Sequence, residues 1–197
     1  MSENRSSLTV YLEDFLHEVV NYFEISQYDF KISVLEYSQT FRLQSKFHTD
    51  RKLTNTEISS IGYKRIKPEM AGLFLKPILK KAYLSVNTPL EAYRKKIIVI
   101  FLNQYILDQQ DSSEYANYTK QNGVIFYVVT SFTGSVDIAL SMASDPCKAF
   151  VMNDYKTGMD DIIADLGNNI CLGKLVYSSS QSETQISCVP AYFTQSN

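Results

Sequence analysis

The residues of this chain that could do chemistry are few and scattered. Its two histidines, His17 and His48, have no serine or cysteine beside them in a context that supports nucleophilic catalysis. Its three cysteines, Cys147, Cys171 and Cys188, match no zinc spacing. The G-x-G-x-x-G, P-loop and G-x-S-x-G patterns are absent. The sequence therefore carries no strict signature of an enzyme, and it predicts no cofactor.

Acidic and amide side chains after one apolar run are the remaining candidates. Asp108 and Asp111 follow Ile97–Leu102 closely enough to contact a cation, although a solvated loop is the favoured interpretation. Asn103 and Gln104 come directly after the run, where open parallel sheets bind ligands. A carboxylate there would indicate a metal or an acid–base role, whereas an amide indicates neither.

The elements that must position these residues follow from hydrophobic periodicity. Ile97–Leu102 and Val124–Thr130 are unbroken apolar runs, typical of strands buried on both faces. Phe30–Ser38 and Thr40–His48 alternate and predict an antiparallel hairpin. Helices are predicted over Leu8–Phe23, Ala71–Val86, Ser135–Ala143 and Met159–Ile170, over a short segment from Thr54 to Ile61, and from Ser112 or Ser113 to Gln121. Strands that alternate with helices predict an α/β fold with a parallel sheet.

The length, charge and composition of the chain restrict the kind of protein it can be. The chain has 197 residues and a formal net charge of −2, which gives no basic footprint for nucleic acid. No apolar run is long enough to span a membrane, and the first residues lack a secretory signal pattern. The polar stretch after residue 171 predicts a domain over 1–171 and a tail, or the start of a further domain, over 172–197.

The order of these pieces resembles a von Willebrand factor type A domain. The segments that carry the resemblance are "ISVLEYS", "KKIIVIFLN", "NGVIFYV", "ALSMASDP" and "FVMNDYKTGMDDIIADLGNNIC". The resemblance implies a doubly wound, mostly parallel sheet with one antiparallel edge strand and helices on both faces. It also implies that the first, central strand is missing before Leu8, because the chain is a fragment or because the sheet lacks its centre.

The family's chemistry is a metal-ion-dependent adhesion site, whose ligands this chain does not match. The family's Asp after the fourth strand falls on Asn103, and its Thr falls on Glu69 or Met70. Its Asp-x-Ser-x-Ser loop falls near Glu3, with the leading Asp before Met1. A hard cation needs several anionic oxygens, so the resemblance implies a degenerate site that holds no metal.

The resemblance therefore predicts a non-enzymatic, adhesion-type module that binds a protein or an extracellular-matrix ligand. The residues expected at the binding face are Glu3, Glu69, Met70, Asn103, Gln104 and Thr133. The relatives also imply an extracellular chain that is part of a larger multidomain protein, with the disulfide partner of Cys171 in missing sequence. Two alternatives stay open: an α/β hydrolase with a metal site near Asp108 and Asp111, and a non-functional fragment.

Overall fold

The computed structural model describes residues 7–23, 25, 31–33, 35–37, 41–43, 47, 49–59, 72–89, 94–102, 105–130, 135–151 and 162–167. The chain divides into two compact units. One unit combines residues 1–70 with 155–167, and the other combines 71–154 with 168–197.

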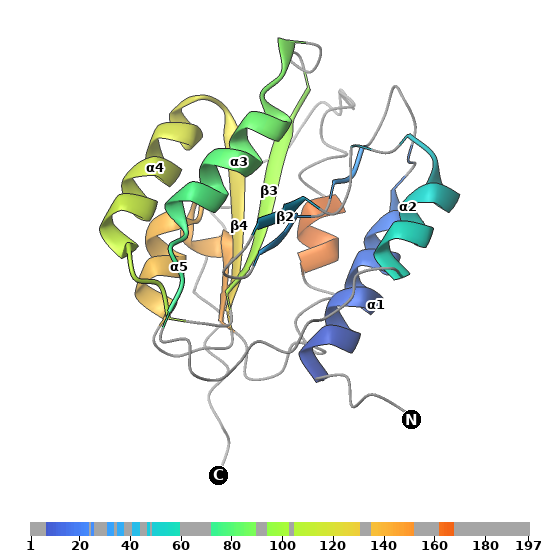
Figure 1. The fold of residues 1–197 in the computed structure, drawn as a ribbon, viewed down its shortest axis with the longest axis horizontal. Helices are drawn as coiled ribbons and strands as arrows, with labels where there is room; N and C mark the ends of the chain where they lie inside the picture. The colour runs from blue at the N-terminus through green and yellow to red at the C-terminus, as the bar shows by residue number, and fades with distance from the viewer. Residues whose placement is uncertain are drawn as a thin grey trace, which may run out of the picture. The chain divides into compact units, whose positions relative to one another are not determined.

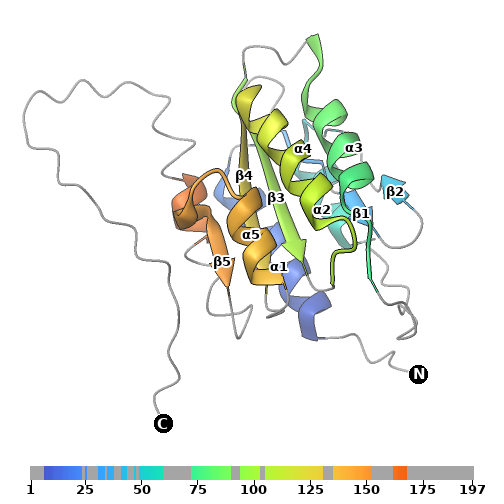
Figure 2. The same ribbon diagram turned by 90° about the vertical axis from the view of Figure 1, so that its left-hand side faces the viewer.

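The second unit is built on a parallel three-stranded sheet. Its strands β3 (Lys96–Leu102), β4 (Val124–Thr130) and β5 (Ala149–Val151) lie in the order β3-β4-β5. The register pairs Ile98 with Phe126 across the first two strands. Figure 2 shows the arrowhead of β3 pointing downward, and this end of the sheet is its carboxyl end. The buried parallel strands confirm the predicted α/β class.

Strand β4 is the centre of this sheet and is buried on both faces. Phe126 and Val128 point to one face, Tyr127 and Val129 to the other, and all four are fully buried. An unbroken apolar sequence is therefore the pattern that this position requires.

Three helices cover one face of the sheet. They are α3 (Lys76–Val86), α4 (Gln109–Gln121) and α5 (Val136–Met142), and α4 packs between the other two (Figures 1 and 2). Helix α4 ends at Gln121 and is followed by Asn122 and Gly123, as predicted. Gly123 has a φ of 81°, which glycine adopts without strain.

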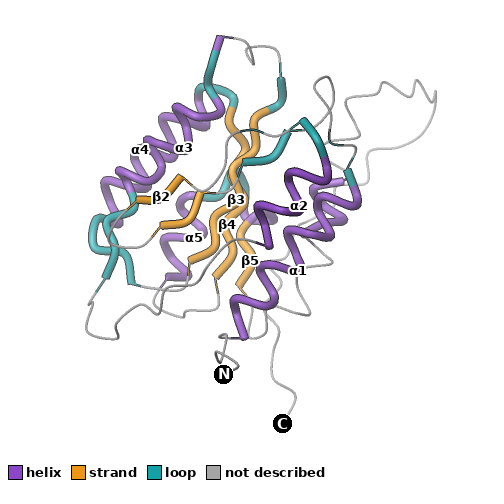
Figure 3. The backbone as a smooth tube through the Cα atoms, turned by 45° about the vertical axis from the view of Figure 1, so that its right-hand side comes forward, coloured by secondary structure: helices purple, strands orange, loops and turns teal. Residues whose placement is uncertain are grey.

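The first unit contains two longer helices, a hairpin and a short helical segment. Its elements are α1 (Ser7–Tyr22), β1 (Leu35–Tyr37), β2 (Phe41–Leu43), α2 (Arg51–Ser59) and helical residues 162–167 (Figure 3). The antiparallel pairing of β1 with β2 confirms the predicted hairpin. The predicted apolar face of α1 is buried at Phe15, Val19, Val20 and Phe23.

The starts of three helices differ from the prediction. Helix α3 begins at Lys76 because Pro77 fits only its first turn, so the segment before it is not helical. Helix α2 begins at Arg51, where the Asp50 carboxylate accepts from the Leu53 N–H at 2.9 Å. Helix α4 begins at Gln109, three residues before the expected Ser112.

Two predictions about chain organisation stay predictions. Among the described residues, β3 has β4 as its one partner strand in the sheet. Whether the family's first, central strand is missing therefore stays a prediction. The domain boundary at residue 171 lies outside the described residues. Among the described helices, none has the length and hydropathy needed to cross a membrane.

Candidate functional site

Two chain segments meet at the carboxyl end of β3. Leu73 pairs with Ile106 in an isolated parallel bridge. The Leu73 N–H donates to the Tyr105 carbonyl at 2.9 Å, and the Leu107 N–H donates to the Leu73 carbonyl at 2.8 Å. Leu73 and Ile106 are buried beneath the bridge. The segment before α3 is thereby held beside the segment that leaves β3.

The residues that flank this bridge expose large apolar side chains. The exposed fractions are 62% for Phe74, 49% for Tyr105 and 47% for Leu107. Neighbours of a paired residue point to the opposite side, so these three side chains face away from the buried pair. We call Phe74, Tyr105 and Leu107 the ribbon patch.

Gly72 lets Leu107 lie close to the backbone of the neighbouring segment. A Cβ at Gly72 would lie 2.7 Å from both Cγ and Cδ2 of Leu107. The φ of Gly72 is 152°, which also favours glycine. Any larger residue at this position would push Leu107 out of its place in the ribbon patch.

The Asp108 carboxylate fixes the start of α3. Its Oδ1 accepts from the Leu75 N–H at 2.7 Å, and its Oδ2 accepts from the Lys76 N–H at 2.9 Å. Asp111 pairs with the Lys76 ammonium at 3.0 Å. Both carboxylates are therefore bound to groups at the start of α3, and Asp108, in the turn before α4, caps α3 rather than being only solvated.

These contacts leave Asp108 poorly placed to bind a divalent cation. Such a cation needs carboxylate oxygens free to coordinate it, and both oxygens of Asp108 already accept backbone N–H groups. Nowhere in the described ranges do three or more His, Cys, Asp or Glu side chains gather into a possible metal site.

The six predicted binding residues all lie outside the described residues. They are Glu3, Glu69, Met70, Asn103, Gln104 and Thr133. Four of them lie close to the ribbon patch in sequence, since Phe74 follows Met70 by four residues and Tyr105 follows Gln104 directly. Sequence reasoning missed the patch, because the apolar run Leu73–Leu75 reads as the start of a helix.

A group of tyrosines lies where α3 meets α4. The ring centroids of Tyr83 and Tyr115 are 6.4 Å apart, and those of Tyr115 and Tyr118 are 5.8 Å apart. Burial raises the pKa of Tyr115 above its usual value, and the neighbouring Tyr118 and Tyr83 raise it further. The phenol of Tyr115 therefore stays protonated to a higher pH than an isolated tyrosine.

Lys120 joins the end of α4 to the end of α5. Its ammonium donates to the Ala143 carbonyl at 2.9 Å and to the Ser141 carbonyl at 3.2 Å. These are the carbonyls that a helix end leaves without a partner in the helix. Burial lowers the pKa of Lys120.

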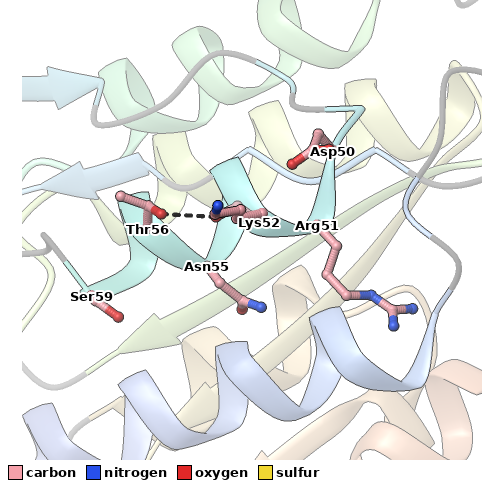
Figure 4. Close-up of a pocket in the computed structure, with 6 residues that line it drawn as sticks. All are labelled: Asp50, Arg51, Lys52, Asn55, Thr56 and Ser59. Atoms are coloured by element: carbon pink, nitrogen blue, oxygen red, sulfur yellow. Dashed lines mark hydrogen bonds between the residues drawn. The ribbon is translucent and has the colours of Figure 1, made fainter.

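The first unit has a shallow hollow of about 740 Å³ on the surface of α2. It is lined by Asp50, Arg51, Lys52, Asn55, Thr56 and Ser59, and Asn55 points from α2 toward α1 (Figure 4). The Nδ1 of His17 lies 2.8 Å from the Asn55 Oδ1, and its Nε2 lies 3.3 Å from the Ser59 hydroxyl.

This arrangement resembles the cysteine–histidine–asparagine triad of some hydrolases, with serine in place of the cysteine. Here the serine–histidine distance is long for a hydrogen bond to a hydroxyl, and Ser59 is exposed at the end of its helix. The guanidinium of Arg51 also donates to the Phe23 carbonyl at 3.1 Å. We assign these side chains to holding α2 against α1, so His17 is a structural residue.

Cys147 forms a disulfide bond. The only other cysteines of the chain, Cys171 and Cys188, lie outside the described residues. Asp145 accepts from the Cys147 N–H at 2.9 Å and so fixes the turn that leads into β5. The three cysteines are therefore not all free thiols in the structure.

The family model of the von Willebrand factor type A domain matches residues 4–183. The chain belongs to this family. The domain resembles the solved structure of proximal thread matrix protein 1 (PTMP1) from mussel byssus, with 13% identity and a TM-score of 0.70. That match covers 85% of this chain and 42% of PTMP1, so the chain spans about two fifths of that protein's length.

Two further structures support the same fold. PTMP1 with a zinc-occupied MIDAS motif matches with 14% identity and a TM-score of 0.71, over 83% of this chain and 41% of PTMP1. BatB from Bacteroides thetaiotaomicron matches with 12% identity and a TM-score of 0.59, over 83% of this chain and 89% of BatB. Among curated proteins, no sequence matches this chain.

Proposed function

We propose that this domain is a non-enzymatic module that binds a protein or an extracellular-matrix component at the carboxyl end of its sheet. The ribbon patch is the observation that carries the proposal. Three large apolar side chains, each about half exposed or more, are held there by a hydrogen-bonded bridge. Aromatic and aliphatic anchors held in place are typical of the centres of protein interfaces.

Binding in this proposal does not use a metal ion. The residues at the family's ligand positions support this: Asn103 offers a neutral amide, and Glu69 or Met70 stands in place of a threonine. The carboxylate of Asp108, six residues after the end of β3, caps α3. Glu3, Gln104 and Thr133 complete the proposed binding face around the patch.

An extracellular location belongs to the same proposal. Disulfides such as that of Cys147 persist in oxidising compartments and are rare in the cytosol. The structural neighbour PTMP1 is named as a proximal thread matrix protein of the mussel byssus, which supports this location. Because the chain spans 42% of that protein, a place within a larger multidomain chain is also part of the proposal.

The test is a solid-phase binding screen of the full chain against secreted and extracellular-matrix proteins. Each ligand found is then measured with a variant that carries Phe74→Ser, Tyr105→Ser and Leu107→Ser. A control variant carries Leu84→Ser and Tyr118→Ser, two residues that are 61% and 51% exposed on α3 and α4.

We expect the patch variant to weaken binding at least about tenfold, which corresponds to roughly 1.4 kcal/mol. The control variant should stay within about twofold of the wild type, because its side chains lie outside the patch. Equal loss in both variants, or loss in the control alone, would place the binding face elsewhere on the domain.

A further inference from the structure

The triplet Asn117-Tyr118-Thr119 lies in the third turn of α4 and matches the acceptor pattern for N-glycosylation. The Asn117 side chain is exposed in the folded domain. A glycan attached to it would extend into solvent and displace no side chain of the core. The native fold therefore accepts the modification at this position.

The third residue of the triplet is placed differently. Thr119 is fully buried, and its hydroxyl donates to the Ala116 carbonyl at 2.8 Å. A transferase that recognises the triplet needs this hydroxyl, and it needs the backbone in a non-helical form. Neither is accessible once α4 has formed, so only the unfolded or growing chain presents a usable acceptor.

We infer that Asn117 is an N-glycosylation site that is modified before α4 folds. The inference rests on the extracellular location proposed above. The donor is a lipid-linked oligosaccharide diphosphate of the secretory pathway. The Asn117 Nδ2 attacks the C1 carbon of the first sugar and loses one proton. A C–N bond forms, the C–O bond to the phosphate breaks, and the lipid diphosphate leaves.

The attachment point of the glycan is separated from the ribbon patch along α4. Asn117 is eight residues into α4, which is about 12 Å along the helix axis from the end that follows Leu107. Because a glycan is bulky and hydrated, the face of α4 that carries Asn117 would have to face solvent. The carboxyl end of β3 stays available for a partner, as the proposed function requires.

The experiment expresses the full chain behind a cleavable secretion signal in cultured animal cells. The Asn4→Gln variant serves as the background, because Asn4-Arg5-Ser6 is the other matching triplet. Secreted protein is analysed by intact mass before and after treatment with peptide N-glycosidase, and by peptide mapping. The variant with both Asn4→Gln and Asn117→Gln is the control, and its melting temperature reports whether it folds.

We expect one glycan on the Asn4→Gln protein, an aspartate at position 117 after enzymatic release, and no glycan on the double variant. Folded, unglycosylated chain incubated with microsomal membranes and the lipid-linked donor should stay unmodified. Secreted Asn4→Gln protein with an unmodified Asn117 would overturn the inference. Because the added signal forces secretion, that result is separate from a failure of the binding screen, which would overturn the proposed function instead.

Discussion

Replacing Asp108 by alanine tests whether this carboxylate serves the fold. The substitution leaves the Leu75 and Lys76 N–H groups without the acceptors that lie at 2.7 and 2.9 Å. The Lys76 residue is exposed, and water can replace its acceptor, whereas Leu75 is fully buried. Loss of a helix cap costs about 0.5 to 2 kcal/mol, and the buried donor places this case at about 1 to 2 kcal/mol.

Thermal unfolding followed by circular dichroism measures the effect. For a chain of this length, each kcal/mol corresponds to roughly 2 to 4 °C, so Asp108→Ala should lower the melting temperature by about 2 to 8 °C. Asp108→Asn keeps one carbonyl oxygen but no charge, and we expect roughly half that loss. Asp111→Ala is the matched control, because its ion pair with Lys76 is largely exposed and contributes at most about 1 kcal/mol.

Two results would refute the reasoning. One is an equal melting temperature for the Asp108→Ala and Asp111→Ala proteins, which would mean that the cap stabilises the fold no more than the exposed ion pair does. The other is stabilisation of the wild type by Mg²⁺ that disappears in Asp108→Ala, because a ligand that binds only the folded state must raise its stability. That second result would restore the hydrolase alternative with its metal near Asp108 and Asp111.

Three further measurements follow from the described contacts. Gly123→Ala should lower the free energy of unfolding in urea by about 1 kcal/mol, because alanine is strained at a positive φ although its Cβ would meet no other atom. Gly72→Ala should lower it further, because its Cβ would also lie 2.7 Å from Leu107. Tyr115 has a raised pKa, so the unfolded chain releases this proton first and stability falls as pH rises from 10.0 through the raised value. Tyr115→Phe should therefore lose less stability than the wild type as pH rises above 10.0, measured by urea unfolding. Millimolar Mg²⁺ or Mn²⁺ should leave the wild-type melting temperature unchanged, and a shift of several degrees would contradict the metal-free interpretation.

The sheet could be predicted because its sequence pattern is local and strong. The run Val124–Thr130 has to be apolar throughout, since β4 is buried on both faces. Its neighbour Ile97–Leu102 shows the same pattern, although alternate residues of β3 are only half-buried. Both strands lie within one residue of their predicted bounds.

The first residues of the helices were predicted less accurately than the strands, because the side chains that cap a helix can be distant in sequence. Asp108 directly precedes α4 but caps α3, whose first residues lie 32 and 33 positions earlier. Near α2 two capping candidates compete, and Thr54 is buried with its hydroxyl bonded to the Asp50 carbonyl. Composition at a helix start does not reveal which of several polar residues faces the free N–H groups.

The ribbon patch depends on the same distant pairing. Leu73 and Phe74 could belong equally to an amphipathic helix or to an extended segment, and the bridge to Ile106 decides between them. The signals in the sequence were Gly72 and Pro77, which together bound a segment too short for a helix of its own. Only the bridge shows which of its side chains are exposed.

Because both oxygens of Asp108 bind N–H groups at the start of α3, we expect binding at this end of the sheet to depend on apolar contact and not on a metal ion. Metal-bridged binding is lost when a chelator removes the ion, whereas binding through the ribbon patch depends on the area of apolar surface removed from water. Binding of a ligand found in the screen should therefore be unchanged by EDTA and only weakly reduced by high salt, with a negative heat-capacity change in calorimetry. Loss of binding in EDTA, restored by added Mg²⁺ or Zn²⁺, would show that residues beyond Asp108 and Asp111 complete a working metal site.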